Sequence, residues 1–260
     1  MARTAVSGRL SWLVATVKEA RDETATARTL TLDVPGWPGH VAGQHVAVRL
    51  TAADGYAAQR DYSIANAGSP NPGAAGAQDA GRLEITVQRL ADGEVSPYLA
   101  GVAEPGDQFE VRGPIGGWFA WPGDDPRPLL LLAGGSGIVP LMSMIRTHAQ
   151  VKSKVPVRLV YSARTPDDVI YADELSERVQ VAQLTLTYAY TRWWPGDPPA
   201  GAHAGRINAD VIGQAAFPPE GNPLVFICGP SGFVEAASAL LIAAGHPPFT
   251  IKTERFGATS

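Results

Sequence analysis

The chain of 260 residues contains a single cysteine, Cys228. One thiol excludes a disulfide within the chain. It also excludes an iron–sulfur cluster held by the chain's own thiolates, because such a cluster takes about four sulfur ligands. We expect no metal site.

The sequence also lacks a strong excess of either charge. Its net charge is −4 and its pI is near 5.7, which gives no overall reason to expect a nucleic acid or an anionic membrane as partner. The start of the chain, residues 1–17, lacks the apolar core and small-residue cleavage site of a signal peptide. We therefore expect a cytoplasmic protein.

No long apolar run is uninterrupted. Residues 128–145 carry no charge over 18 positions, which approaches the length of a membrane-spanning helix. Three glycines and Pro140 interrupt this run in its middle. A buried strand, a turn and the start of a helix explain the pattern better.

The first half of the chain has the pattern of a β domain. Six short runs have period-two or β-branched character and are separated by Gly, Pro and Asp turns. They cover residues 10–17, 27–34, 44–50, 60–67, 82–90 and 107–113. This pattern predicts an antiparallel barrel or sandwich, with a flexible loop over 69–81 and its one helix beginning near residue 93.

After residues 121–128 the pattern changes. Nearly continuous apolar strands now alternate with helical segments, which predicts a parallel sheet of five or six strands covered on both faces. We place the domain boundary at about residue 124, so that residues 1–124 form the barrel domain and 125–260 the α/β domain.

Glycine-rich turns follow two of the predicted parallel strands. Gly134–Gly137 connect the first of these strands to a helix, and Cys228–Pro230 end a later one. Glycines let the main chain approach a ligand, and the carboxyl ends of parallel strands are where open α/β sheets bind ligands. A tight structural turn and a small buried cysteine are the simpler alternatives. Glu254 and Phe256 end the last strand, where the alternative is a solvated tail.

Two polar segments stand out in the barrel half. Arg60, Tyr62 and Ser63 place a cation, an aromatic ring and a hydroxyl close together. Taken alone, the stretch is more simply explained as a strand end with an ordinary surface arginine. In residues 93–99, Ser96 suits a helix cap and Pro97 the first helical position. The alternative function of this segment is a phosphate cradle.

Taken together and in order, these segments resemble the ferredoxin–NADP reductase superfamily over nearly the whole chain. The resemblance rests on six motifs: Arg60-Asp61-Tyr62-Ser63, Gly93-Glu94-Val95-Ser96, Gly113-Pro114-Ile115-Gly116 with Phe119, Gly134 to Pro140, Cys228-Gly229-Pro230, and Glu254-Arg255-Phe256-Gly257. It implies a Greek-key barrel that binds FAD, followed by an α/β domain that binds NAD(P).

The resemblance also implies roles for individual residues. Arg60 would pair with the flavin diphosphate, the Tyr62 ring would pack on the isoalloxazine, and Ser63 would hydrogen-bond to flavin N5. Cys228 and Glu254 would flank the nicotinamide, so that Ser63, Cys228 and Glu254 are the expected catalytic residues. Further cofactor contacts are expected from Ile64, Val87, Gly93, Val95, Ser96, Gly135, Ser136, Gly137, Gly229, Pro230 and Phe256.

The expected activity is FAD-dependent NAD(P)H oxidation, with electrons passed to an external acceptor such as a ferredoxin or an oxygenase, by a monomer. Two alternatives stay open. One is a reductase that uses free flavin as its substrate, which the Gly93–Ser96 diphosphate motif disfavours. The other is a non-catalytic flavin-binding electron-transfer subunit, which the paired nucleotide motifs disfavour.

The choice of nicotinamide depends on the ends of two strands. Thr191 and Arg192 occupy the place of a Ser-Arg pair in NADP-using relatives, and Ser162 and Arg164 end the preceding strand. Cations and hydroxyls there suit a 2′-phosphate, so we expect NADPH. NADH stays possible, because Asp167 and Asp168 lie nearby and Arg192 could be an ordinary loop residue.

Overall fold

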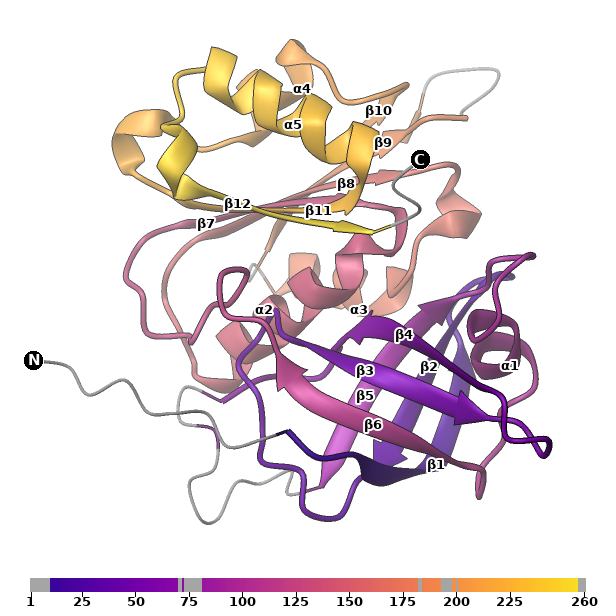
Figure 1. Cartoon of the computed structure of the whole chain (residues 1–260). Coiled ribbons are helices and arrows are strands. Elements are labelled where there is room, and N and C mark those ends of the chain that lie inside the picture. Colours follow the sequence, from indigo (N-terminus) through magenta and orange to yellow (C-terminus); the bar gives the residue numbers. More distant parts are fainter. Residues whose placement is uncertain are drawn as a thin grey trace, which may run out of the picture.

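The computed structural model describes residues 10–69, 72, 81–181, 184–192, 198–199 and 201–256. Figure 1 shows two stacked domains, each built on one six-stranded sheet. Within the described residues, no helix is both long enough and apolar enough to cross a membrane.

The first sheet is antiparallel, with strand order β4-β3-β6-β1-β2-β5. Its strands are β1 (Leu13–Asp22), β2 (Ala27–Asp33), β3 (His45–Thr51), β4 (Ala57–Ser63), β5 (Arg82–Gln88) and β6 (Gln108–Ile115). An antiparallel bridge between Ile64 and Ile85 joins the two end strands, β4 and β5, so the sheet closes on itself. Helix α1 (Ser96–Gly101) packs its Leu99 into the same core.

The second sheet is parallel throughout, with strand order β10-β9-β8-β7-β11-β12. Its strands are β7 (Leu129–Gly134), β8 (Val157–Ala163), β9 (Thr185–Tyr190), β10 (Ala202–Ala204), β11 (Leu224–Pro230) and β12 (Ile251–Phe256). The central strand β7 is buried along its whole length, because helices cover both of its faces.

Alternate residues of β7 point to two different apolar layers. Leu129 and Leu131 pack with α2 (Ile138–Gln150) and α3 (Ala172–Gln180), on the side of the barrel. Leu130 and Leu132 pack with α4 (Ala209–Ala215) and α5 (Ser231–Ala243), on the opposite side. Figure 1 shows α2 and α3 lying between the parallel sheet and the barrel.

The apolar layer around α2 continues into the barrel domain. Ala42, Ala65 and Trp121 belong to the same buried cluster as Leu141 and Met144 of α2. The two domains therefore share part of one core.

The predicted fold class is confirmed, and the run 128–145 divides into β7 and α2 as expected. Strand β10 and helix α4 were not predicted, because they have only three and seven residues. Helix α4 begins after Asn208, whose side chain accepts a hydrogen bond from the Val211 amide, 2.9 Å away. The boundary near residue 124 lies in the connection between β6 and β7 and stays a prediction. The predicted loop 69–81 lies mostly outside the described residues, as does Gly257.

Two local predictions need correction. The segment Arg60–Ser63 ends a strand that already begins at Ala57, whereas a strand over 60–67 was expected. Ser96 is not the helix cap: Val95 occupies that position, and the Ser96 hydroxyl instead accepts a hydrogen bond from the Leu90 amide, 3.1 Å away.

Candidate functional site

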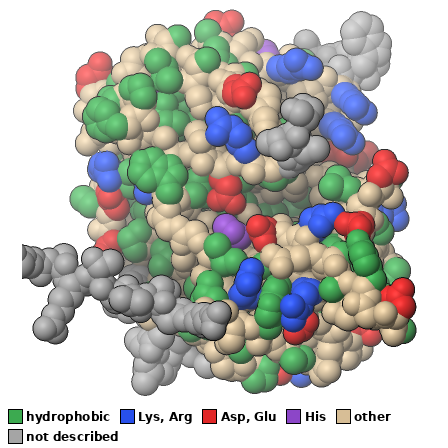
Figure 2. All heavy atoms as spheres, viewed as in Figure 1, with side chains coloured by type: hydrophobic (Ala, Val, Ile, Leu, Met, Phe, Trp, Pro, Cys, Tyr) green, Lys and Arg blue, Asp and Glu red, His purple; other side chains and the backbone are tan. Residues whose placement is uncertain are grey.

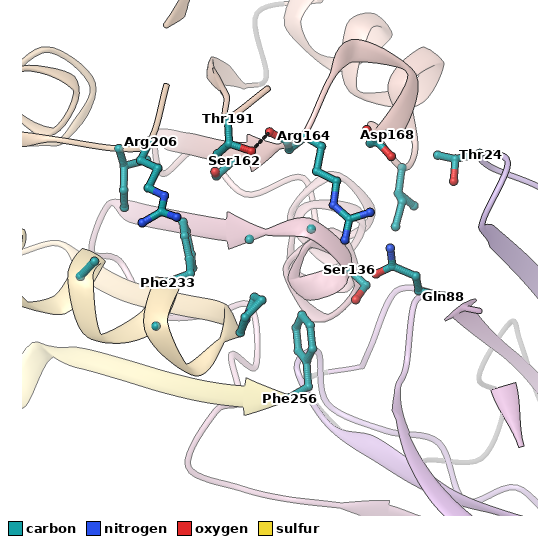
Figure 3. Close-up of a pocket in the computed structure, with 18 residues that line it drawn as sticks. Thr24, Gln88, Ser136, Ser162, Arg164, Asp168, Thr191, Arg206, Phe233 and Phe256 are labelled. Atoms are coloured by element: carbon teal, nitrogen blue, oxygen red, sulfur yellow. Dashed lines mark hydrogen bonds between the residues drawn. The ribbon is translucent and has the colours of Figure 1, made fainter. Parts of the chain in front are cut away.

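A cavity of about 460 Å³ lies at the junction of the two domains, at the carboxyl ends of the parallel strands (Figure 3). Thr24 and Gln88 line it from the barrel, and the remaining lining residues come from the α/β domain. Seven residues predicted to bind the nicotinamide nucleotide line it: Gly135, Ser136, Ser162, Arg164, Thr191, Pro230 and Phe256. Figure 2 shows the groove between the domains opening on this face, with acidic side chains and a histidine near its rim.

Two glycines of the turn after β7, Gly134 and Gly137, are packed too closely against β11 and α5 to carry side chains. A Cβ on Gly137 would lie 2.1 Å from the main-chain oxygen of Cys228, and one on Gly134 would lie 2.8 Å from the Phe233 ring. Gly135 has a φ of +54°, and a Cβ there would meet nothing within 4 Å. At Gly134 and Gly135 the turn thus presents bare main chain to the cavity, which suits close contact with a planar polar group such as nicotinamide.

Two arginines reach the cavity from opposite ends. In Figure 3, Arg164 extends toward Ser136 and Gln88, and Arg206 extends toward Phe233. Neither guanidinium has a carboxylate partner among the described residues. The cavity therefore offers two cations to an anionic ligand.

Arg206 was missed by sequence reasoning, and Arg192 was chosen instead. Arg192 is exposed and is not among the residues that line the cavity; its amide donates to the Arg164 oxygen, 2.8 Å away. Arg206 lies just before α4, an element that was not predicted either, so nothing in the local pattern marked its position.

Hydroxyl groups and one carboxylate complete this end of the site. Ser162 is buried, and the Thr191 hydroxyl donates to the Ala163 oxygen over 3.4 Å. The Asp168 carboxylate accepts hydrogen bonds from the amide and the hydroxyl of Thr165, at 3.1 and 2.7 Å. Asp168 is thus already engaged in capping its own short turn.

Cys228 and Glu254 are direct neighbours on β11 and β12. Cys228 is 1% exposed, and burial, with a smaller effect of Glu254, raises the pKa of its thiol well above the usual range. Burial, and secondarily the charge of Asp61, raises the pKa of Glu254 to about 7. Asp61 lies on β4, within the segment Arg60–Ser63.

The barrel residues predicted to hold a flavin also come together. Arg60 is ion-paired with Glu94, which joins β4 to the Gly93–Ser96 segment, and the Tyr56 hydroxyl donates to Glu94 over 2.6 Å. A Cβ on Gly93 would lie 2.6 Å from the Ser96 hydroxyl oxygen and 3.2 Å from the Leu90 main-chain oxygen, so a side chain at this position would displace the Ser96 hydroxyl.

Tyr62 and Ser63 are half-buried at the end of β4. Burial raises the pKa of Tyr62 to about 12, so its ring is a neutral aromatic surface at physiological pH. In contrast, the side chains of Ile64, Val87 and Val95 are fully buried in the barrel core, which leaves only their main-chain groups to meet a ligand.

These residues fit the two expected groups. The Arg60 guanidinium and the buried Ser96 hydroxyl beside Gly93 suit a diphosphate, and the neutral Tyr62 ring next to the Ser63 hydroxyl suits an isoalloxazine. The glycine-lined cavity reaches the same barrel domain at Thr24 and Gln88.

Comparisons with known proteins agree with this arrangement. Residues 15–119 match the oxidoreductase FAD-binding domain family, and residues 131–239 match the oxidoreductase NAD-binding domain family. The chain is 32% identical over 194 residues to ferredoxin–NADP reductase B of Sorangium cellulosum, covering 72% of this chain and 73% of that protein. It is 31% identical over 247 residues to the ferredoxin reductase component of 3-ketosteroid-9-alpha-monooxygenase from Mycolicibacterium smegmatis, covering 92% of this chain and 64% of that protein.

The fold is also that of a solved FAD/NAD-binding domain. The corresponding domain of nitric oxide dioxygenase from Vibrio cholerae superposes with a TM-score of 0.80 at 22% identity, covering 95% of this chain and 99% of that one. Several curated relatives are longer, and the chain spans 52–64% of their length. With both domain families matched in order, the chain belongs to the ferredoxin–NADP reductase superfamily of FAD- and NAD-binding oxidoreductases.

Proposed function

We propose that this protein oxidises NADPH with FAD as its bound cofactor and passes the electrons to a separate redox protein. The observation that supports this most directly is the cavity at the domain junction, which residues of both domains line and which the bare main chain of Gly134 and Gly135 borders. When bound, FAD supplies the redox chemistry, accepting a hydride and releasing electrons singly. The protein supplies binding, orientation and local charge.

In this proposal Arg60 and the Gly93–Ser96 turn hold the flavin diphosphate. Arg60 exchanges Glu94 for a phosphate oxygen, and the Ser96 hydroxyl, which accepts from Leu90, still has its own proton to donate. Tyr62 covers the isoalloxazine, and Ser63 hydrogen-bonds to its N5. The main chain at Ile64, Val87 and Val95 completes this contact surface.

At the nicotinamide, Gly135, Ser136 and Pro230 line the cavity, and Phe256 covers it from β12. Gly137 and Gly229 allow this surface to form, because Gly137 packs against Cys228 and Gly229 against Gly134. Cys228 acts as a neutral, compact side chain, since burial keeps its thiol protonated. Glu254 has a pKa near neutrality and can hold or release a proton beside the reacting rings.

We propose NADPH as the donor because the cavity carries two cations without carboxylate partners among the described residues, whereas its one carboxylate is engaged with Thr165. Ser162, Arg164, Thr191 and Arg206 are the residues that we assign to the adenosine phosphates. We keep Arg192 as a weaker candidate, because its side chain is exposed outside the cavity lining.

Arginine variants test this assignment. We expect Arg206→Ala to lower kcat/KM for NADPH at least tenfold and to change kcat/KM for NADH less, because a charge-assisted contact to phosphate contributes about 1.5–3 kcal/mol. Arg192→Ala is the matched control. A wild-type preference for NADH, or a larger effect of Arg192→Ala than of Arg206→Ala, would overturn the assignment.

The electron acceptor is proposed from the relatives. Several are reductase components of oxygenases, among them the ferredoxin reductase component of 3-ketosteroid-9-alpha-monooxygenase. We therefore propose a ferredoxin or an oxygenase as the acceptor for this chain. A monomeric state and a cytoplasmic location stay predictions.

The absorption spectrum of the purified protein separates the proposal from its alternatives. A yellow protein with about one FAD per chain, bleached anaerobically by NADPH, is the expected result. A colourless protein that reduces added flavin indicates a free-flavin reductase. A yellow protein that reduced nicotinamide does not bleach indicates a non-catalytic carrier.

A further inference from the structure

Helix α2 connects the two halves of the proposed site through one of its faces. It begins directly after the Gly134–Gly137 turn, and its polar residues Ser143, Arg146 and Thr147 lie at helical spacings of three and four. All three contact residues 65–68, a segment separated from Ser63 only by Ile64. The nucleotide turn and the flavin motif are thus joined by one rigid helix.

Two of the contacts are hydroxyl hydrogen bonds in a fully buried setting. Ser143 donates to the Asn66 oxygen over 2.7 Å, and the Gly68 amide donates to the Thr147 hydroxyl over 2.8 Å. The Thr147 hydroxyl gives its own proton to the Ser143 oxygen, 2.7 Å away, so its direction is fixed and it can only accept from Gly68. Both hydroxyl side chains are 0% exposed.

The space around Gly68 leaves little freedom for this segment to shift. A Cβ on Gly68 would lie 2.3 Å from the Ala42 amide nitrogen. Residues 65–68 are therefore held between residues 41–42 of the barrel and helix α2.

Arg146 supplies the third contact. Its guanidinium donates to the Ala65 oxygen over 2.9 Å and to Glu84 of β5 over 3.0 Å, while Glu174 of α3 binds it at 2.6 Å. The same guanidinium lies 5.0 Å from the centre of the Tyr171 ring. A cation from α2 is thus shared between carboxylates of both domains.

A separate chain of hydroxyls crosses the same junction. The Tyr171 hydroxyl lies 2.5 Å from that of Thr86, and the Thr86 hydroxyl lies 2.7 Å from that of Thr29. Thr29 gives its proton to Glu23 over 2.6 Å. Each hydroxyl has one proton, so Tyr171 donates to Thr86, and Thr86 donates to Thr29.

We propose that Ser143, Arg146 and Thr147 are positioning residues for hydride transfer, which hold the end of β4 at a fixed distance from the Gly134–Gly137 turn. The inference rests on the proposed function. None of the three lines the nucleotide cavity, so they act on the rate of transfer and not on the affinity for either ligand. A misplacement of about 1 Å between reacting groups can cost roughly a hundredfold in rate.

The test compares Thr147→Val, which keeps the shape but loses the acceptor for Gly68, with Thr147→Ser, which keeps the hydroxyl. Ser238→Ala is the matched control, because the Ser238 hydroxyl donates within its own helix to the Val234 oxygen, 2.7 Å away. Holoprotein is mixed anaerobically with saturating NADPH, and the rate of flavin bleaching is measured. The Kd values for FAD and NADP⁺ are measured separately, together with hydrogen exchange at the Gly68 amide in flavin-free protein.

We expect Thr147→Val to slow bleaching at least fivefold, to leave both Kd values within twofold of wild type, and to speed exchange at Gly68 at least tenfold. Thr147→Ser should restore the rate, and Ser238→Ala should change nothing. Ser143→Ala should slow bleaching in the same way if Thr147→Val does not fold. The inference is overturned if the rate stays within twofold of wild type, or if it falls only in proportion to FAD affinity.

Failure of the proposed function has a different signature. If NADPH does not bleach the wild-type protein, hydride transfer is not its reaction and the positioning role is lost with it. Exchange at Gly68, which needs no flavin, then still reports whether Thr147 holds this segment.

Discussion

Replacing Glu254 by glutamine should change how stability depends on pH. The usual pKa of a glutamate is 4.5, and burial, with a smaller contribution from Asp61, raises the pKa of Glu254 to about 7 in the folded protein. Between these two values the folded chain binds more protons at Glu254 than the unfolded chain does. Stability from this group is therefore fully present below pH 4.5 and is lost as the pH rises through about 7.

The size of the effect follows from the shift. A difference of one pKa unit corresponds to about 1.36 kcal/mol, so ionisation of Glu254 lowers the free energy of unfolding by about 2–3 kcal/mol between roughly pH 5 and pH 8. A glutamine side chain cannot ionise, so the variant should lack this loss. Glu254→Gln should therefore gain about 2–3 kcal/mol relative to wild type over the same interval.

Urea unfolding of flavin-free protein at several pH values measures this difference. Glu235→Gln, at an exposed glutamate on α5, is the matched control and should differ from wild type by a constant amount. Asp61→Asn removes the secondary cause and should make the wild-type loss smaller. A difference between Glu254→Gln and wild type that is the same at about pH 5 and pH 8 would refute the reasoning.

Three further predictions concern the flavin motif and the glycine turn. Arg60→Ala should weaken FAD binding roughly tenfold to hundredfold in a fluorescence titration. Glu94→Gln should tighten FAD binding, because it removes the carboxylate that now pairs with Arg60. Equal FAD affinity in both variants would argue against a phosphate contact of Arg60. Ser63→Ala should keep the wild-type Kd for FAD but slow its reduction by NADPH, and an unchanged rate in single-turnover measurements would exclude a contact with N5. Gly137→Ala should lower the free energy of unfolding by about 1–3 kcal/mol, since its Cβ would lie 2.1 Å from the Cys228 oxygen. Gly213→Ala, on an open helical face, should raise the free energy of unfolding by up to about 1 kcal/mol. Similar losses in the two variants would mean that the close packing at Gly137 is not the cause.

The strands of both sheets could be predicted because burial imposes its period on the sequence. In β6, Phe109 and Val111 point inward and their neighbours do not, which is the period-two pattern of a half-buried strand. In β7 every residue is buried, which is the continuous apolar run of a central parallel strand. Elements as short as β10 and α4 contain too few residues for either period to be recognisable.

Residues of the candidate site could be predicted where close packing restricts the residue type. Gly137 faces the Cys228 oxygen at a distance that excludes any side chain, so only glycine fits and the turn is visible in the sequence. Arginines are different, because a long side chain can reach a ligand from many positions. Arg192 follows β9 directly, and Arg206 follows a segment that is partly undescribed, yet it is Arg206 that lines the cavity. The residue type alone therefore does not decide between them.

For the contacts of α2 with residues 65–68, the sequence indicates that buried hydroxyls require a hydrogen bond, but it does not identify the partner. Ten residues of α2 are buried, among them Ser143 and Thr147, so hydroxyls occur on a helix that is otherwise apolar at most of its buried positions. A buried polar group without a partner is costly, so such residues predict a hydrogen bond to some neighbouring element. The partners lie 77–81 residues earlier in the chain, in the other domain, and no local pattern links them. The segment they contact continues the proposed flavin motif. On the assignments proposed above, the residues that recognise the cofactor differ from those that fix its position. Only the recognition residues restrict the residue type strongly enough to form a motif.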